Sequence, residues 1–330
     1  MLTILDKLPK GILEYDAEQL YKILNGPTLI HITGVQKDPI FISVLLHGNE
    51  QSGWQAIQRL LTQSANELTR SISLFIANVS AAKHSLRHLP GQLDYNRIWN
   101  GQTEMVEHQM VRQVLDEMRS KKVYAAIDIH NNTGNNPHYA CINNLDDHFK
   151  YFARLFGPLI VYFKQPDSVL SIAFSNLCPT VTLECGQSGD LDGIKRVVNF
   201  LSEILSMQQF PKTVTDVELI SIYQTIATIK ISSQASIGFG ASQSDLQFDE
   251  DLEQFNFREI HPNSRFAKIK STDNRQLLAY NDDGLDVTEK YFYIKDGYIS
   301  TRISIIPAML TQNIDIIKND CLCYLMTQID

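Results

Sequence analysis

The stretch Phe41-Ile-Ser-Val-Leu-Leu-His-Gly-Asn-Glu50 decides the fold of this chain. Its first six residues form a short apolar run that ends in polar turn residues, a pattern that predicts a buried β-strand. Residues 51–63 follow, with apolar side chains at the i, i+3, i+4 spacing of an amphipathic helix (Trp54, Ile57, Leu60 and Leu61). A buried strand followed directly by a helix predicts a parallel α/β sheet.

The same alternation of strand and helix continues to Met207. Further strands are expected at residues 72–77, 124–129, 159–163 and 180–183, and helices at 104–121, 147–156 and 190–207. Two long polar loops are expected at residues 78–103 and 131–147. Because loops at the carboxyl ends of parallel strands are where ligands bind in such sheets, these loops are candidates for a functional site.

Beyond Gln208-Gln-Phe-Pro211 the pattern changes to short β-rich pieces broken by polar turns. Such pieces are expected at residues 216–231 and 291–306, with Asn281-Asp-Asp-Gly284 as a hairpin-type turn. Residues 238–254, with Gly, Ser, Gln and acidic side chains, are interpreted as a loose connection. We predict a larger α/β domain at residues 1–210 and a smaller β-rich domain at residues 211–330.

Composition excludes several classes of protein. The chain has 330 residues, with 29 Lys and Arg against 37 Asp and Glu, and these charges are scattered. A nucleic-acid partner is therefore not expected. No apolar run approaches the roughly 20 residues of a membrane span, and the first residues do not resemble a secretory signal. We predict a cytoplasmic protein. The 5 cysteines, odd in number and irregularly spaced, are expected to be reduced thiols.

His47 and Glu50 come immediately after the strongest predicted strand, at the start of a helix. Two side chains three residues apart at such a turn point toward one place beyond the sheet, as a shared metal ion requires. The alternative is a hydrogen-bonded turn histidine and a first-turn glutamate that favours the helix dipole. This pair alone does not decide between the two.

Asp128-Ile-His130 ends another apolar strand. Alternation along the strand places Asp128 and His130 on the same side, so that His130 is a candidate third ligand and Asp128 a residue that orients it. Three protein ligands leave a fourth position for water, which is the usual arrangement of a catalytic zinc site. The alternative for His130 is a histidine that anchors its loop.

A third strand end carries Glu184, in Val181-Thr-Leu-Glu184. An ionised glutamate at the end of an apolar strand is costly to desolvate unless it is paired or lies near a cation. If all three strands end on one edge, Glu184 lies near the metal and has the chemistry of a general base. The alternative is an exposed glutamate at a strand end.

The first long loop contains Arg87 and Asp94-Tyr-Asn-Arg97. The guanidinium of Arg97 and the amide of Asn96 together suit recognition of a carboxylate. Arg87 is a candidate for polarising a carbonyl and stabilising the oxyanion that develops on it. Taken singly, either arginine is more often a surface group.

These residues, in this order, resemble the succinylglutamate desuccinylase/aspartoacylase family, a branch of the zinc carboxypeptidase superfamily. The resemblance covers residues 41–189 and, more loosely, the β-rich remainder, where His261-Pro262 resembles a landmark of the C-terminal domain. It implies a mostly parallel central sheet flanked by helices. It also implies one zinc ion per chain on His47, Glu50 and His130, with Glu184 as proton shuttle, Arg87 on the scissile carbonyl, and Asn96 with Arg97 on a substrate carboxylate.

The resemblance implies a zinc-dependent deacylase that cleaves the amide bond of a small carboxylate-bearing N-acyl amino acid, with a metal-bound water as nucleophile. Aspartoacylases carry an arginine shortly before the catalytic glutamate, but residues 169–183 here contain no Lys or Arg. N-acetylaspartate is therefore not the expected substrate. In some relatives a tyrosine of the C-terminal domain completes the pocket, and both Tyr291 and Tyr293 remain candidates.

Two other functions stay open. One is a metallocarboxypeptidase or amidase that acts on short peptides, and the other is a noncatalytic module that binds a metal or a carboxylate. Neither a membrane partner nor a particular oligomeric state is predicted, although an oligomer is compatible with the sequence. There is no Gly-x-Ser-x-Gly elbow and no phosphate-binding glycine loop.

Two further side-chain pairs are weaker metal candidates. His84 and His88 would share a face on a helix, but Pro90 and Gly91 close behind them disfavour a long helix there. Cys321-x-Cys323 is too short and isolated for a zinc site, and its thiols are expected to pack in the core.

Overall fold

The computed structural model describes residues 1–63, 68–211, 220–241, 243–270 and 276–329. The chain divides into two compact units, an α/β unit of Met1–Asn131 with His138–Ile220 and a β-rich unit of Asn132–Pro137 with Ser221–Asp330. The predicted boundary between residues 210 and 211 stays a prediction, since residues 212–219 lie outside the described part of the chain.

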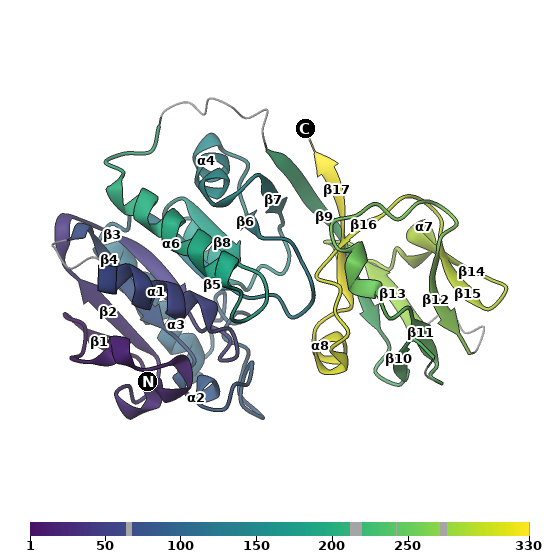
Figure 1. The fold of residues 1–330 in the computed structure, drawn as a ribbon, viewed down its shortest axis with the longest axis horizontal. Coiled ribbons are helices and arrows are strands. Elements are labelled where there is room, and N and C mark those ends of the chain that lie inside the picture. The colour runs from purple at the N-terminus through teal and green to yellow at the C-terminus, as the bar shows by residue number, and fades with distance from the viewer. Residues whose placement is uncertain (64–67, 212–219, 242, 271–275, 330) are drawn as a thin grey trace. The chain divides into compact units, whose positions relative to one another are not determined.

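The α/β unit is built on one sheet, with strand order β1-β2-β4-β3-β5-β8-β6-β7 (Figure 1). Its strands are β1 (Thr3–Leu5), β2 (Thr28–Ile32), β3 (Gly34–Val44), β4 (Leu68–Ile76), β5 (Ala125–His130), β6 (Tyr139–Ile142), β7 (Leu159–Tyr162) and β8 (Thr180–Glu184). Neighbouring strands are parallel except for β2 with β4 and β6 with β8. The predicted mostly parallel sheet is thus confirmed.

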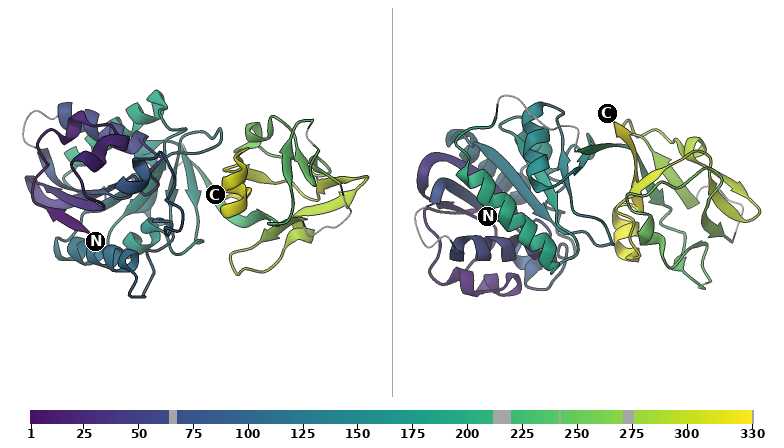
Figure 2. Two further views of the ribbon diagram at one scale, coloured as in Figure 1. Left: turned by 90° about the horizontal axis from the view of Figure 1, so that it is seen from below. Right: turned by 45° about the horizontal axis from the view of Figure 1, so that its top comes forward.

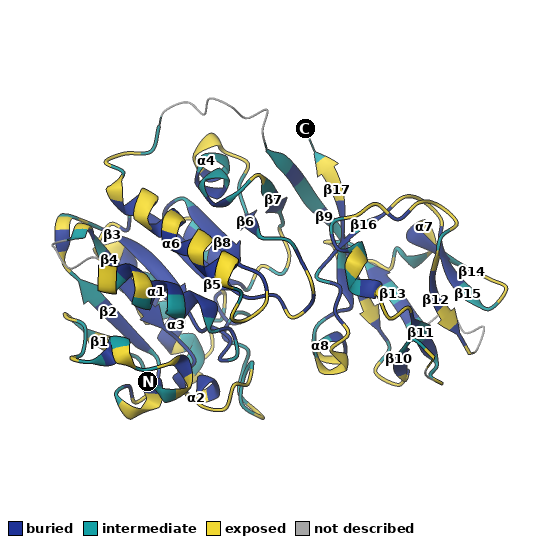
Figure 3. Cartoon of the chain, in the orientation of Figure 1, coloured by how far each residue is buried: buried dark blue, intermediate teal, exposed yellow. Residues whose placement is uncertain are grey.

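Helices flank this sheet: α1 (Ser52–Gln63), α2 (Val79–Ala82), α3 (Val106–Ser120), α4 (Asp147–Phe156), α5 (Leu170–Ser175) and α6 (Leu191–Ser206), besides the 3-10 helices η1 (Ile12–Glu14) and η2 (Ala17–Lys22). Figure 2 shows helices on both sides of the sheet. Alternation along β3 explains this: Phe41 packs with α3 and α5, whereas Val44 points to the opposite face and contacts the start of α1. The strands between the helices are buried (Figure 3), and burial of this apolar surface stabilises the unit.

Most predicted elements of the α/β unit are present within a few residues. Several short elements were not predicted. β1, η1, η2 and β2 precede the first predicted strand, α2 and β6 lie inside the predicted loops 78–103 and 131–147, and α5 lies just before the strand expected at 180–183. β3 also begins at Gly34, earlier than the expected start at residue 41. The polar residues of this extension gave no strand signal because that end of the strand is only partly buried.

The β-rich unit contains two groups of strands. The strands β9 (Ser221–Ile231), β13 (Leu277–Tyr280), β16 (Ile306–Ala308) and β17 (Cys323–Ile329) pair antiparallel. A five-stranded sheet has the order β10-β11-β12-β15-β14, with β10 (Ile237–Phe239), β11 (Leu246–Phe248), β12 (Arg265–Ile269), β14 (Phe292–Lys295) and β15 (Tyr298–Thr301). The short helices are η4 (Leu252–Phe255), α7 (Thr288–Tyr291) and α8 (Ile314–Asn319).

The β-rich prediction for this unit is confirmed, but the interpretation of residues 238–254 as a loose connection was wrong. That stretch contains β11 and most of η4, and its start belongs to β10. Leu246, Phe248 and Leu252 are buried in the core of the unit. Burial of these three apolar side chains holds the otherwise polar segment against the core. The turn at Asn281–Gly284 is confirmed by a hydrogen bond from Gly284 N to Asn281 O. Residues 216–219 of the expected strand 216–231 lie outside the described residues.

The topology of the α/β unit places three strand ends together. β5 is parallel to β3 on one side and to β8 on the other, so the carboxyl ends of all three lie at the same edge of the sheet. The expected shared edge is therefore confirmed. No helix among the described residues is long and apolar enough to span a bilayer.

Candidate metal site

The turn between β3 and α1 presents His47 and Glu50 on the same side. It is closed by a hydrogen bond from Glu50 N to His47 O at 3.1 Å, and Gly48 N donates to Arg87 O at 3.1 Å. A Cβ at Gly48 would lie 2.2 Å from Ala82 N, so only glycine fits where this turn presses against the end of α2. Local packing therefore requires the glycine between the two polar residues.

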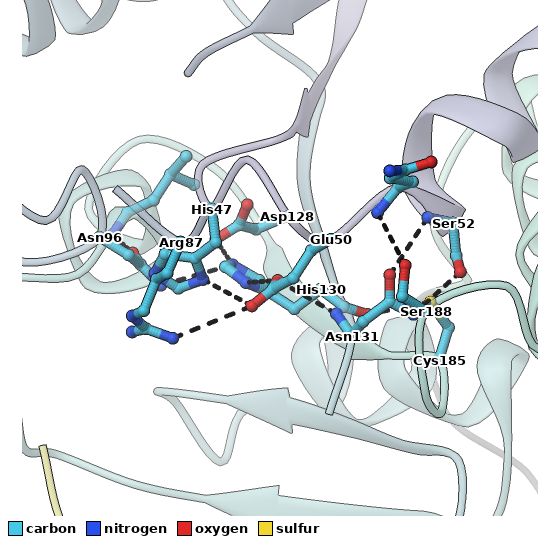
Figure 4. A network of polar contacts seen from close by, with 12 residues as sticks. His47, Glu50, Ser52, Arg87, Asn96, Asp128, His130, Asn131, Cys185 and Ser188 are labelled. Atoms are coloured by element: carbon cyan, nitrogen blue, oxygen red, sulfur yellow. Dashed lines mark hydrogen bonds and ion pairs between the residues drawn. The ribbon is translucent and has the colours of Figure 1, made fainter. Parts of the chain in front are cut away.

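His47, Glu50 and His130 meet at the shared strand edge (Figure 4). His47 Nδ1 lies 2.7 Å from Glu50 Oε1, and His130 Nδ1 lies 2.8 Å from Glu50 Oε2. One ligand atom from each of the three residues lies within 4.8 Å of the other two, and all three residues are buried. Two imidazole nitrogens and a carboxylate at this separation match the ligand types that zinc prefers.

A carboxylate holds the far side of each imidazole. His47 Nε2 lies 3.0 Å from Asp94 Oδ1, and His130 Nε2 lies 2.8 Å from Asp128 Oδ2. Carboxylates in these positions keep a proton on Nε2 and orient Nδ1 toward Glu50, as they do around metal-ligating histidines. The cluster therefore fits a divalent cation in both its donor atoms and its supporting groups.

Charge is unevenly distributed in this cluster. Burial opposes ionisation of Glu50, but His47 and His130 hold its pKa well below the usual range. Burial also disfavours the charged form of His130, yet Asp128 and Glu50 raise the pKa of that imidazole well above its ordinary value. The carboxylates thus stabilise positive charge between them, where a metal cation would take the place of the histidine protons.

Glu184 ends β8 directly beside His130, the third proposed ligand. It is opposite His130 in the parallel β5–β8 ladder, and Cys185 N donates to His130 O at 3.1 Å. Burial, with a contribution from the Glu50 charge, raises the pKa of Glu184 to about 7. A carboxyl group that titrates near neutrality is suited to accept and return a proton.

Arg87 and Asn96 also reach the cluster. The Nε and NH2 atoms of Arg87 donate to Asp94 Oδ2 at 3.1 and 2.9 Å, which leaves NH1 3.9 Å from Glu50 Oε1. Asn96 Oδ1 accepts from Leu170 N at 3.1 Å, and its Nδ2 lies 3.4 Å from His130 Nε2. The start of α5 therefore fixes the orientation of the Asn96 amide.

Arg97 is held differently. Its NH1 donates to Asn96 O at 2.9 Å, and its charge contributes to the lowered pKa of Asp94. No role was predicted for Asp94 from the sequence. It was part of the Asp94–Arg97 motif, but nothing local indicates that its carboxylate reaches His47. For Asp128, by contrast, strand alternation already suggested the contact with His130.

The weaker metal candidates do not form sites. α2 ends at Ala82, so His84 and His88 do not share a helix face. Among the described residues, His47, Glu50 and His130 are the one group of three or more potential ligands that lie close enough to hold an ion. Cys321 and Cys323 are buried and form no disulfide, as expected, and the same is true of Cys141, Cys178 and Cys185.

The two tyrosine candidates have partners within the β-rich unit. Tyr291 is buried in its hydrophobic core, whereas the Tyr293 hydroxyl donates to Asn263 Oδ1 at 2.8 Å. Whether either side chain takes part in the site stays a prediction.

A family model for the succinylglutamate desuccinylase/aspartoacylase catalytic domain matches residues 38–207, just over half of the 330-residue chain. The chain belongs to the succinylglutamate desuccinylase/aspartoacylase family. The matched segment contains every metal, catalytic and substrate residue that the sequence predicted. Since the family consists of hydrolytic deacylases, this member is assigned to that class of enzyme.

Solved structures show the family fold over nearly the whole chain. Succinylglutamate desuccinylase from Chromobacterium violaceum has a TM-score of 0.60 at 14% identity, covering 92% of this chain and 88% of that one. A succinylglutamate desuccinylase/aspartoacylase from Rhodobacter sphaeroides has 0.61 at 12%, covering 92% and 89%. Murine aminoacylase 3 has 0.56 at 17%, covering 90% and 97%. A search of curated protein sequences finds no significant match.

Proposed function

We propose that this desuccinylase/aspartoacylase-family protein is a zinc-dependent hydrolase of the amide bond in small carboxylate-bearing N-acyl amino acids. One observation carries the proposal: two imidazoles, each backed by a carboxylate, meet Glu50 within 4.8 Å beside the buried Glu184. A purely structural cluster has no need for an additional carboxyl group whose pKa lies near 7.

His47, Glu50 and His130 would hold one zinc ion. When bound, that ion would supply a Lewis acid that acidifies water and polarises the scissile carbonyl. Glu184 accepts a proton from the attacking water and delivers it to the leaving amine, so that the amide C–N bond breaks with a neutral amine as product. Its position beside His130 places the carboxylate at the same strand edge as the ligands.

Arg87 and the Asn96–Arg97 pair act on the substrate. Because Asp94 holds Nε and NH2 of Arg87, NH1 is directed toward the Glu50 side of the cluster, where it donates to the oxyanion that develops on the carbonyl. The amide hydrogens of Asn96 and the guanidinium of Arg97 bind the substrate carboxylate. These contacts orient the amide bond before water attacks.

The decisive experiment replaces Glu184 by Gln. We expect kcat to fall by about 10²-fold to 10⁴-fold, because the amide cannot accept the proton. Zinc content should stay unchanged. Release of free amine is measured over a panel of N-acetyl and N-succinyl amino acids and short peptides.

Glu203→Gln, on the exposed surface of α6, is the matched control and should behave like the wild type. Full activity of a zinc-loaded Glu184→Gln protein would refute the role of Glu184. A wild-type protein that binds zinc but hydrolyses no member of the panel would refute the proposed function.

A further inference from the structure

We propose that Asn131 is a positioning residue that fixes the metal ligand Glu50 relative to the general base Glu184; this inference rests on the function proposed above. Asn131 follows His130 at the end of β5 and is buried. It lies between the start of α1 and the loop after β8 (Figure 4). Its contacts reach both sides.

The backbone of Asn131 binds the ligand side. Its N–H donates to Glu50 Oε2 at 3.1 Å, the same oxygen that lies 2.8 Å from His130 Nδ1. This bond fixes the rotation of the Glu50 carboxylate, because Oε2 is then held both by His130, the last residue of β5, and by Asn131, which follows it. Where Asn131 lies therefore determines where the Glu50 oxygens lie.

The side chain of Asn131 joins two other segments. Oδ1 accepts from Ser52 N at 3.1 Å, while Nδ2 donates to Ser52 Oγ at 2.9 Å and to Gly186 O at 2.9 Å. Ser52 is two residues after Glu50, and Gly186 is two residues after Glu184. A single amide thus connects the segment that carries the ligand to the segment that carries the base.

The loop on the base side has little room to shift. Gly186 has a φ of 78°, and a Cβ there would lie 2.5 Å from Asp190 Oδ2. A Cβ at Gly193 would lie 1.9 Å from Cys185 O, so the start of α6 presses directly on this loop. Gly189 N donates to Ser52 Oγ at 3.1 Å, which ties the loop to α1 a second time. A small movement of Asn131 would therefore be transmitted to Glu184.

Asparagine suits this position because it offers an acceptor and two donated hydrogens at one buried point. Alanine would leave Ser52 N–H and Gly186 C=O without these partners, and both residues are buried. Serine is shorter than asparagine, so its hydroxyl cannot reach both segments. It leaves space for water, which can satisfy the backbone groups that lose the amide.

The test compares Asn131→Ala and Asn131→Ser with the wild type. Zinc affinity is measured by competition with a chromogenic chelator, and kcat and KM are measured separately. We expect zinc affinity and kcat each to fall by about 10-fold to 100-fold. KM should change by less than about threefold, because Asn96 and Arg97 are untouched.

Asn143→Ala is the matched control. Asn143 belongs to the same unit, and its Nδ2 donates to a backbone carbonyl, Phe163 O, at 3.0 Å, but it contacts none of the proposed ligands. It should lower thermal stability while zinc affinity and kcat per bound zinc stay as in the wild type.

A folded Asn131→Ala or Asn131→Ser protein with wild-type zinc affinity and kcat would overturn the proposal. Equal losses in Asn143→Ala would overturn it as well, because they would show a general effect of destabilising the unit. If the wild type hydrolyses no substrate of the panel, the proposed function fails separately, and the zinc measurement alone decides the role of Asn131.

Discussion

The α/β unit contains two clusters that include buried charged groups, one near each end of its strands. Near the amino end of β4, the fully buried Arg70 donates through NH1 to Asp38 and through NH2 to the carbonyls of Met207 and Gln208. Its guanidinium also lies 3.7 Å from the ring centroid of Tyr124. At the carboxyl ends, His47, Glu50, Asp94, Asp128 and Glu184 gather near Arg87 and Arg97.

The two clusters differ in which groups supply their positive charge. The NH1 and NH2 atoms of Arg70 contact the Asp38 carboxylate and three backbone carbonyls, so the protein itself compensates this charge, although within the described residues Arg70 Nε is buried without a hydrogen-bond partner. In the second cluster, four carboxyl groups lie near two arginines and two histidines, and within the described residues Asp128 Oδ1 is buried without a hydrogen-bond partner. A buried cation that is paired with a carboxylate stabilises the fold, whereas carboxylates that meet histidines can bind a metal cation in place of the histidine protons.

The largest effect on stability is expected from Arg70→Met. Loss of the buried guanidinium leaves three backbone carbonyl groups, the Asp38 carboxylate and the Tyr124 ring without their partner, so the free energy of unfolding should fall by about 4 kcal/mol. Arg119→Met, on the exposed face of α3, should change it by less than about 0.5 kcal/mol. Urea unfolding measures both. Zinc affinity should be unchanged in both variants. Equal, small losses of unfolding free energy in both would mean that the Arg70 cluster does not stabilise the fold.

A second effect concerns pH and the metal-free protein. Burial raises the pKa of Glu184 from 4.5 to about 7, so the folded state binds this proton more tightly than the unfolded chain. The resulting stability is fully present below pH 4.5 and is lost as pH rises through 7, by about 3 kcal/mol. Glu184→Gln should remove this contribution to the dependence of the unfolding free energy on pH. Parallel pH profiles for the two proteins, measured with a chelator present, would contradict the shift.

A smaller effect is expected from Asp94→Asn and Asp128→Asn. Each amide is a weaker partner for the histidine Nε2–H, so zinc affinity should fall by about 10-fold to 100-fold. Asp116→Asn, which changes an exposed carboxylate of α3, is the control and should leave affinity unchanged. Chelator competition measures all three. Wild-type affinity in both site variants would show that these carboxylates do not support the ligands.

Much of the fold was predictable because apolar periodicity reflects burial directly. The strands β5 and β8 and the second half of β3 are buried throughout, and the helix α1 follows β3 with its buried stripe. β6 and the segment containing β11 were not predicted. Each is short and set in polar sequence, so only tertiary packing identifies it as a strand.

The candidate site was predictable only in part. His47, Glu50, His130 and Glu184 follow strong strands, so parallel pairing alone brings them to one edge. Asp94 lies in a loop without periodicity, and its contact with His47 spans 47 residues. The contacts of Asn131 with Ser52 and Gly186 depend on side-chain geometry across three segments. No local pattern in the sequence encodes such contacts.

Zinc content measured after dialysis is the most direct test of the central claim that the carboxyl-end cluster binds one cation. The wild type, Glu184→Gln and Arg70→Met should each retain about one zinc per chain, since in none of them is a proposed ligand changed. Glu50→Gln should retain almost none and yet stay folded. A wild type without zinc at micromolar free metal, or a Glu50→Gln protein that retains as much as the wild type, would contradict the claim.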